Sequence, residues 1–579
     1  MTTADPALDT PIAHYIWQTR YRAEGEVTVA DTWRRVAHSL AAVEPEDPAG
    51  WEQRFYDVLR DFQFLPGGRI LAGAGTIHDV TLLNCFVMGT IEDSIPGIFR
   101  ALQEGAVTMQ HGGGVGYDFS TLRPRGLRAR TTGAIASGPL SFMDVWDAMC
   151  ATIQSTGVRR GAMMATLRCD HPDVGAFIDA KRDPARLRHF NLSVQVTDAF
   201  MRAVEQDDAW HLAFPVGTAT QVVQARALWD RLLHASYESS EPGVLFIDQI
   251  NRMNNLYYCE QISACNPCGE VPLPPYGACD LGAINLPALV RHAFTPHAQL
   301  DLERLEHIVP IAVRMLDNVI ELSRFPMPEQ QYVVRQTRRI GLGITGLADA
   351  LIMLGLRYDL AMARALAGGI LRTMCHAAYR QSIALSKQKG SFPAFDRERY
   401  LDGLFVRTLP EDIRDGIARS GARNSHLLAI APTGTISLLA GNLSSGLEPV
   451  FAADQERTVL DAADVPRQFH LTDHAVRLWR VHHGRPDGHP DALVTAQELS
   501  IDAHLSMQAE LQRYVDNSIS KTINVPAETS FAAFASLYRL AYDKGVKGCT
   551  TFRASVGRGT VLTGSPPTEM ASCGIRRCE

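Results

Sequence analysis

Residues 265–286 constrain the local fold of this chain more than any other segment, because their prolines exclude most regular structure. The prolines within residues 272–275 forbid a helix and exclude a central strand. Immediately before them, the run Asn-Pro-Cys-Gly-Glu places Asn266, Cys268 and Glu270 at alternate positions. Alternate side chains of an extended segment share one face. The sequence therefore predicts a stiff loop that presents an amide, a thiol and a carboxylate to one place.

Three interpretations of this loop are open at this point. The carboxylate can accept a hydroxyl proton and the amide can bind hydroxyls, so the trio suits a substrate with adjacent hydroxyl groups. Cys279, eleven residues after Cys268, would then be a redox partner. Alternatively, Cys265 and Cys268 have the C-x-x-C spacing of half a zinc site, although no second pair follows at finger spacing. The thiols could also be ordinary buried side chains.

The bulk properties of the chain exclude several classes of protein. Its 579 residues are 46% hydrophobic and 21% charged, as in globular proteins with an ample core. The net charge of −7 argues against a nucleic-acid partner held by bulk electrostatics. No apolar run is long enough to predict a membrane span or contact with a membrane. Eleven cysteines without a signal peptide predict a reducing, cytoplasmic location, where paired thiols are more often redox-active than structural.

The pattern of hydrophobic residues predicts an α/β fold with a small helical region at its start. Helical spacing covers residues 27–42 and 51–62, and later residues 308–322 and 362–387. Short β-branched runs alternate with the helices, which is typical of α/β proteins. By contrast, residues 453–495 are polar and rich in proline and histidine, so we expect them to be mainly loop.

Three segments are candidates for binding anions. Basic residues flanked by glycine occur around Arg123 and again at Arg159 and Arg160; they predict phosphate contacts, with solvated loops as the alternative. In addition, an expected strand at residues 427–431 runs into the small, hydroxyl-rich turn 432–437 and then a helix start. Backbone N–H groups and the helix dipole favour phosphate there, although a plain turn is the alternative. The segment lacks the Gly-Lys-Ser/Thr of a Walker A loop.

The C-terminal residues, from about 561 onward, are predicted to form a flexible tail. This tail carries the thiol pair Cys573 and Cys578. A mobile thiol pair can exchange with a disulfide inside a site and then swing out to be reduced again. The alternative is an irregular terminus with cysteines that have no role.

Eight short motifs, taken in order, resemble a known family. They are L-P-G-G-R-I-L (65–71), N-C-F-V (84–87), G-G-G-V-G (112–116), R-R-G-A-M-M (159–164), N-P-C-G-E (266–270), A-P-T-G-T-I-S (431–437), S-S-G-L-E-P-V (444–450) and S-K-T-I-N-V-P (520–526). The chain resembles the catalytic chain of ribonucleotide reductases, and specifically the adenosylcobalamin-dependent class II enzymes, over about residues 60–560.

This resemblance implies a particular architecture. We expect a ten-stranded α/β barrel, made of two antiparallel halves of parallel strands around a central finger loop, over residues 63–560. The helical N-terminal region would occupy residues 1–62, and the flexible redox tail residues 561–579.

The resemblance also implies roles for the loop residues. Cys268 would be the transient thiyl radical that abstracts the 3′ hydrogen of the ribose. Glu270 would take the 3′-hydroxyl proton while the 2′-hydroxyl leaves as water, and Asn266 would hold the hydroxyls. Adenosylcobalamin would be the cofactor from which the radical comes, and no metal ion would be bound by protein side chains.

The reducing electrons have implied carriers as well. Cys85 and Cys279 match the cysteine pair that ends each turnover as a disulfide. Cys573 and Cys578 resemble the tail pair that reduces this disulfide, with thioredoxin or a similar protein as the external reductant.

The remaining implied contacts concern substrate and regulation. The residues expected to contact the ribonucleotide are Gly68, Asn84, Gly114, Pro432, Thr433, Gly434, Thr435 and Ser437. A homodimer with a deoxynucleotide effector site at its interface is expected, and the candidates for that site are Asp93, Arg123, Arg159 and Arg160.

The choice of class depends on one further feature of the sequence. A class I large subunit needs a separate radical-generating subunit and a pair of tyrosines that pass the radical inward. Where that pair is expected the chain reads K-T-I-N-V-P and G-C-T-T-F-R, without adjacent tyrosines. Cobalamin is therefore the expected cofactor, with a class I large subunit as the alternative and a zinc- or thiol-rich binding protein as a remote one.

Overall fold

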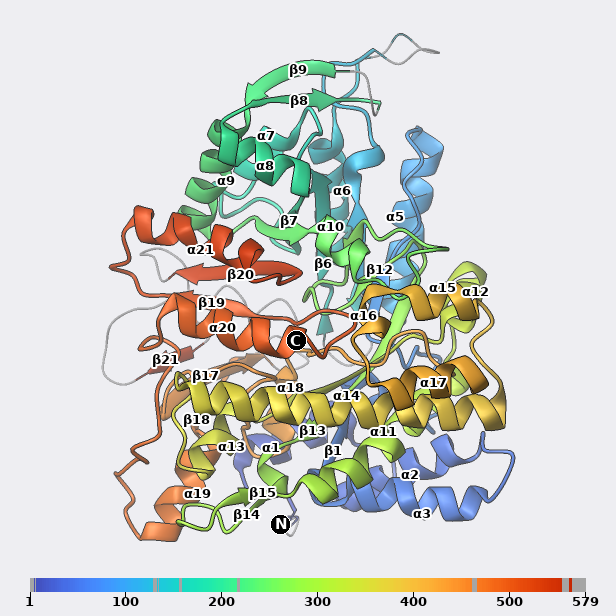
Figure 1. Ribbon diagram of the computed structural model, residues 1–579, viewed down its shortest axis with the longest axis vertical. Helices are drawn as coiled ribbons and strands as arrows, with labels where there is room; N and C mark the ends of the chain where they lie inside the picture. The colour runs from blue at the N-terminus through green and yellow to red at the C-terminus, as the bar shows by residue number, and fades with distance from the viewer. Residues whose placement is uncertain are drawn as a thin grey trace.

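The computed structural model describes most of the chain. The described residues are Asp5, 7–128, Gly133, 135–155, 159–215, 219–460, 466–553 and 562–564. Figure 1 shows β-strands enclosed by helices, with the N-terminal helices gathered at one end. None of the helices in these ranges combines the length and apolar character that crossing a membrane requires.

The N-terminal region is helical, as expected. It contains α1 (Pro11–Ile16), α2 (Val29–Ala41) and α3 (Pro48–Leu59). Thr28 caps α2 in a capping box with Asp31, which satisfies N–H groups that the first turn leaves without partners. Both α2 and α3 pack against the barrel helix α11 (Figure 1).

The first half of the barrel consists of five parallel strands. In spatial order they are β2 (Cys85–Val87), β3 (Gly114–Asp118), β6 (Met163–Arg168), β7 (Phe190–Val196) and β10 (Gly243–Phe246). Parallel neighbours need crossover connections. Helix α5 (Ile95–Gln110) makes the first of these and α6 (Pro139–Thr152) lies within the second.

The second half runs antiparallel to the first. It consists of β13 (Ala278–Asn285), β16 (Ile340–Thr345), the segment 428–430, β19 (Thr522–Val525) and β20 (Gly548–Arg553). The long helices α11 (Leu302–Leu322) and α14 (Ala361–Lys389) belong to this half and confirm the helices predicted over 308–322 and 362–387.

Two antiparallel seams and two single bridges close the ring. The seams join β2 to β13 and β10 to β20. The bridges pair Leu342 with Leu428 and Ile430 with Ile519. The expected strand at 427–431 is thus reduced to two bridging residues. The predicted ten-stranded α/β barrel, with antiparallel halves of parallel strands, is confirmed.

The finger loop enters the barrel on a short hairpin. Strand β11 (Ala264–Cys265) pairs with β12 (Pro272–Leu273), and residues 266–271 form the loop between them. Three hydrogen bonds fix this loop: Asn266 Oδ1 accepts from Val271 N at 2.9 Å, Asn191 Nδ2 donates to Pro267 O at 2.8 Å, and Ser518 N donates to Glu270 O at 2.9 Å. Because these bonds reach both halves of the barrel, the fold as a whole holds the loop.

Glycine at position 116 allows the hairpin to lie close to β3. A Cβ atom there would lie 1.9 Å from the carbonyl oxygen of Cys265, which is backbone and cannot rotate away.

We therefore expect Gly116→Ala to displace the finger, to lower the free energy of unfolding by about 2–3 kcal/mol, and to abolish activity. Urea unfolding tests this, with Gly369→Ala as the control. Nothing lies within 4 Å of a Cβ at position 369 of α14, so that change should be neutral or stabilising. Equal stabilities of the two variants would contradict the prediction.

The expectation of a mainly loop structure for residues 453–495 is wrong. This segment contains β17 (Asp454–Leu460), β18 (Pro466–Thr472) and α19 (His474–His483). Strand β17 lies between β18 and β21 (Leu562–Gly564). The sequence conceals β17 because polar residues occupy its inward face, so no alternation of apolar and polar side chains is visible.

Candidate active site

One large cavity, of about 420 Å³, lies inside the barrel around the finger loop. The lining includes Asn266, Cys268 and Glu270 of the loop and Cys85 of β2. All residues predicted to contact the substrate also line it: Gly68, Asn84, Gly114, Pro432, Thr433, Gly434, Thr435 and Ser437. Folding thus brings together residues that are up to 369 positions apart in the sequence, from Gly68 to Ser437.

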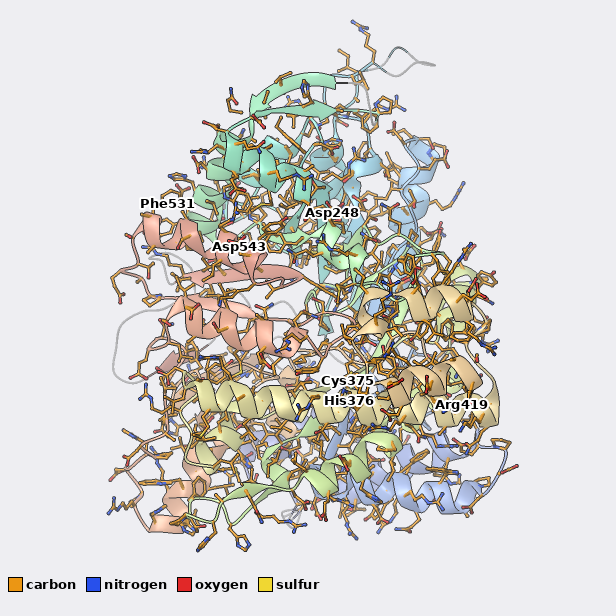
Figure 2. The ribbon with its side chains drawn as sticks, viewed as in Figure 1. Asp248, Cys375, His376, Arg419, Phe531 and Asp543 are labelled. Carbon is orange, nitrogen blue, oxygen red and sulfur yellow. The ribbon has the colours of Figure 1, made fainter. Side chains whose placement is uncertain are left out.

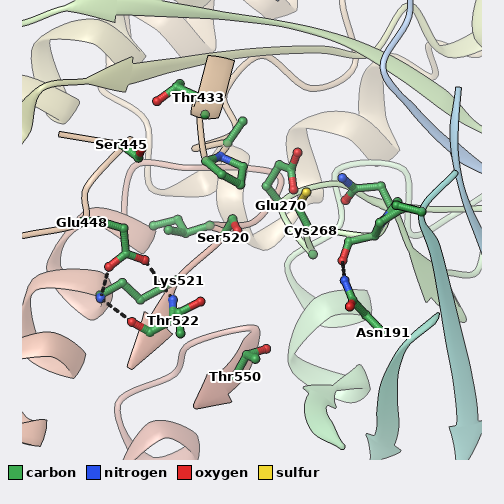
Figure 3. A pocket seen from close by; sticks show the side chains of 18 of the residues that line it. Asn191, Cys268, Glu270, Thr433, Ser445, Glu448, Ser520, Lys521, Thr522 and Thr550 are labelled. Atoms are coloured by element: carbon green, nitrogen blue, oxygen red, sulfur yellow. Dashed lines mark hydrogen bonds and ion pairs between the residues drawn. The ribbon is translucent and has the colours of Figure 1, made fainter. Parts of the chain in front are cut away.

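The loop side chains converge on one point of this cavity. Cys268 lies at the tip of the loop and is partly exposed, and Figure 3 shows Cys268 and Glu270 among the residues that line the cavity. Asn266 Nδ2 donates to Cys85 Sγ at 3.2 Å, and Cys85 Sγ donates to Glu270 Oε1 at 3.6 Å. Two members of the predicted trio, Asn266 and Glu270, therefore share a contact network with one predicted redox thiol.

Burial changes the acidity of Glu270. Its side chain is 1% exposed, and desolvation raises the pKa of this carboxyl group above its usual value, although hydrogen bonds from Asn266 and Cys85 oppose the shift. Oε2 has no hydrogen-bond partner among the described residues. A carboxyl group with a raised pKa and an open oxygen facing a cavity is suited to exchange a proton with a bound substrate.

Cys85 and Cys279 face each other across the seam between β2 and β13. They are directly opposite in the antiparallel register, and both are buried thiols. Opposite residues of antiparallel strands have Cα atoms about 4.5–5.5 Å apart, which lies within the range that a disulfide spans. Burial and the nearby Asp280 raise the pKa of the Cys279 thiol well above its usual value, so it stays protonated at neutral pH. Cys279 itself lies behind the cavity wall rather than in it.

The predicted phosphate turn has a defined conformation. Thr433 adopts a left-handed backbone with φ of +55°, which a residue other than glycine rarely does. Its hydroxyl group holds this conformation, because Oγ1 hydrogen-bonds Thr345 Oγ1 at 2.9 Å and accepts from Gly446 N at 3.0 Å. Helix α18 (Gly434–Leu439) begins at the next residue. The turn therefore faces the cavity with backbone N–H groups and small hydroxyl side chains.

Sequence reasoning gave no role to several residues of the cavity wall. Figure 3 shows Lys521 hydrogen-bonded to Glu448 and to the carbonyl oxygen of Thr522, the latter at 2.8 Å. Asn191, on β7, supports the finger at Pro267. The motifs S-S-G-L-E-P-V and S-K-T-I-N-V-P contain the ion pair, but nothing in their spacing indicated that the two would meet.

Other predicted residues are not among the described residues that line this cavity, or lie outside the described residues. Asp93 and Arg123 bind each other, with Arg123 Nε donating to Asp93 Oδ2 at 2.7 Å. Arg159 and Arg160 form β5, which pairs with β4 (Gln154–Ser155). Neither residue of the predicted tail pair, at positions 573 and 578, lies among the described residues.

Some thiols have surroundings typical of ordinary core residues. Cys375 lies on α14, as Figure 2 shows. It is buried and does not line the cavity. Cys265 is buried at the base of the finger hairpin, where burial raises its pKa. Within the described ranges, no group of three or more His, Cys, Asp or Glu side chains is arranged to hold a metal ion.

The closed barrel encloses a thiol-tipped loop and a facing pair of thiols, an arrangement suited to the redox chemistry of an oxidoreductase. Comparison with known proteins identifies which one: the chain belongs to the ribonucleotide reductase family. Residues 7–79 match the all-alpha domain of that family and residues 83–552 match its barrel domain. The family predicted from the eight motifs is confirmed.

Individual relatives support the same assignment. The chain is 39% identical to a vitamin B12-dependent ribonucleoside-diphosphate reductase of Mycobacterium tuberculosis, over 94% of this chain and 79% of the relative. It is 35% identical to an enzyme of the same name from Thermoplasma acidophilum, over 88% and 66% of the two chains. A ribonucleoside-diphosphate reductase subunit alpha of Chlamydia pneumoniae is 25% identical over 89% and 56%.

Proposed function

We propose that this chain reduces ribonucleoside diphosphates to 2′-deoxyribonucleoside diphosphates through a thiyl radical on Cys268. The observation that carries this proposal is the contact network at the finger loop, where Cys85 Sγ lies 3.2 Å from Asn266 Nδ2 and 3.6 Å from Glu270 Oε1, in the cavity that Cys268 also lines. The diphosphate is proposed because the most similar relatives are named ribonucleoside-diphosphate reductases.

Each side chain then has a defined step. The Cys268 radical abstracts the hydrogen of C3′, while the Glu270 carboxylate accepts the 3′-hydroxyl proton and Asn266 orients the hydroxyl groups. The 2′-hydroxyl leaves as water. Cys85 and Cys279 together supply two protons and two electrons and end as a disulfide. Cys268 returns its hydrogen to C3′, which restores the radical and balances the reaction.

The flank of the cavity beyond the finger tip has chemistry suited to adenosylcobalamin. That flank is formed by β7, β10, β19 and β20, and its side chains are small, apolar or uncharged hydrogen-bonding groups. The residues that would hold the amide-bearing corrin ring are Asn191, Ser193, Val244, Leu245, Asn524 and Thr550. When bound, this cofactor supplies the organic radical that oxidises the Cys268 thiol.

Two observations favour the cobalamin class over a class I large subunit. None of the described residues lining the cavity is a tyrosine, whereas a class I enzyme needs a tyrosine pair there. Two vitamin B12-dependent relatives, at 39% and 35% identity, also resemble this chain more than the subunit alpha relative does at 25%, while a third vitamin B12-dependent relative, of Streptomyces clavuligerus, is 26% identical.

The proposal is tested by incubating the purified chain with a dithiol reductant and each ribonucleoside di- and triphosphate, with and without adenosylcobalamin. Deoxynucleotide should form only with the cofactor, and from diphosphates. Product that requires a separate metal-radical subunit instead would place the chain in class I.

The proposed tail pair gives a separate prediction. Changing both Cys573 and Cys578 to serine should abolish turnover with thioredoxin as reductant, because the Cys85–Cys279 disulfide can no longer be reached. The reduced double variant should still form about one product molecule per site, and a small dithiol should restore turnover. Quantified deoxynucleotide in a rapid-quench experiment measures this. Full turnover with thioredoxin would exclude the tail as the electron carrier.

Regulation and assembly remain predictions. Deoxynucleotide effectors would bind near Asp93 and Arg123 in a homodimer, with Arg159 and Arg160 as further anion contacts. The hydrogen-bonded pair of Asp93 and Arg123 supports the location, since the two residues lie 30 positions apart and nevertheless meet. The cytoplasmic location also stays a prediction.

A further inference from the structure

The phosphate turn meets a strongly negative ligand without a positive charge of its own. Residues 432–437 offer backbone N–H groups and hydroxyl groups, all of them uncharged. A diphosphate carries two to three negative charges, and bidentate arginine contacts are the strongest that proteins make to phosphate. A cation near this turn is therefore the missing component of the site.

Arg457 comes from the β17–β18 hairpin, which sequence reasoning took for loop. Its side chain lines the cavity although the residue is only 6% exposed. Gln455, two positions earlier on the same face of β17, lines the cavity as well. Burial lowers the pKa of Arg457 to about 10, so the guanidinium group is still charged at neutral pH.

A short series of contacts connects β17 with the phosphate turn. Asp454, at the start of β17, pairs in register with Thr472, whose carbonyl oxygen accepts from Asn442 Nδ2 at 2.9 Å. The next residue, Leu443, donates its N–H to the carbonyl oxygen of Ser437 at 3.1 Å. The hairpin is thus attached directly behind the turn, and Arg457 lies three residues along β17 from this attachment.

The other charged residues of the described cavity wall are placed differently. Lys521 is bonded to Glu448. Arg69 lies against Gly112 in the other half of the barrel, where a Cβ atom at position 112 would be 2.4 Å from its guanidinium group. Near the turn, burial and the neighbouring Asp349 raise the pKa of Asp473 well above its usual value, which keeps that carboxyl group neutral.

We propose that Arg457 binds the diphosphate of the substrate, with the β17–β18 hairpin positioning its guanidinium group opposite the turn at residues 432–437. This inference rests on the proposed function, because it names a binding residue for the same substrate. It gives strand β17, through Arg457, the role of bringing a positive charge to the phosphate end of the cavity.

The test measures binding rather than turnover. Equilibrium affinities of the full chain for CDP, CMP and cytidine are compared in the wild type, Arg457→Gln and Arg457→Lys, by isothermal titration calorimetry. Arg467→Gln is the matched control, since Arg467 is an exposed arginine on the partner strand β18. We expect R457Q to weaken CDP binding by about 10- to 100-fold and to keep the affinity for cytidine within about twofold of the wild-type value. R467Q should match the wild type.

The outcomes separate the possible roles of this residue. An equal loss for cytidine and CDP would show that Arg457 only supports the fold, and unchanged CDP binding would likewise overturn the inference. If R457Q does not fold, R457K provides the test. Lysine is shorter and cannot make a bidentate contact, so it should weaken the affinity for CDP by about 3- to 10-fold without changing the affinity for cytidine. Unchanged CDP binding by R457K again overturns the inference. Failure of the wild type to make deoxynucleotide would reject the proposed function, whereas the binding ratios test Arg457 independently.

Discussion

Replacing Cys268 with serine is expected to abolish ribonucleotide reduction, by about 10⁴-fold or more, while the protein stays folded. The hydroxyl group of serine has the shape of the thiol, but its O–H bond is too strong for the oxygen to carry the radical. Because Cys268 is partly exposed at the tip of the finger, its sulfur makes little contribution to packing. The free energy of unfolding should therefore change by about 0.5 kcal/mol or less.

The measurement compares deoxynucleotide formation and urea unfolding for C268S and for Cys259→Ser. Cys259 is a suitable control, since it is exposed and precedes the same hairpin but does not line the cavity. C259S should keep both activity and stability. If C268S retained measurable turnover, the radical would have to reside on another group, and the proposed mechanism would be wrong.

Replacing Glu270 with glutamine should have the second-largest effect on catalysis, a loss of about 10²- to 10⁴-fold. Glutamine keeps the size of the side chain but cannot accept the 3′-hydroxyl proton. Because burial raises the pKa of the Glu270 carboxyl group, the wild-type rate should rise with pH at higher values than an ordinary carboxylate would give. The remaining rate of E270Q should lack this rise. A pH–rate profile of the same shape in both proteins would contradict the assignment of Glu270 as the base.

The same substitution should stabilise the protein at high pH. A carboxyl group whose pKa is raised by folding contributes its full stability below the pKa of the unfolded chain and loses it as pH rises through the folded pKa. Above that range the wild type buries a charge that E270Q lacks, so E270Q should be more stable by about 1–3 kcal/mol. The difference should vanish in acid. Urea unfolding at several pH values tests this. A constant difference in the free energy of unfolding across these pH values would show that ionisation of Glu270 does not destabilise the protein.

The sequence predicted the finger loop because covalent geometry acts locally. Proline excludes helix and central strand, and the alternation of Asn266, Cys268 and Glu270 along an extended backbone places their side chains on one face. Helical periodicity likewise predicted α2, α11 and α14, because the spacing of apolar residues reflects the face that each helix buries.

Other features depend on contacts between distant residues and could not be predicted locally. The pairing of Cys85 with Cys279 follows from the register of two strands that meet at the barrel seam. The ion pair of Glu448 with Lys521 joins loops 73 residues apart. Strand β17 remained hidden because its inward face carries Gln455 and Arg457, so its hydrophobic pattern is that of a loop.

The sequence alone thus determined the fold class and the family and predicted the reacting groups, because these depend on residue types and short spacings. Only the tertiary structure decided which of these groups touch, how deeply Glu270 is buried, and which strand carries a charge into the cavity. Proton affinity and contact depend on the surrounding low-dielectric interior, and that interior exists only after distant parts of the chain have closed into a barrel.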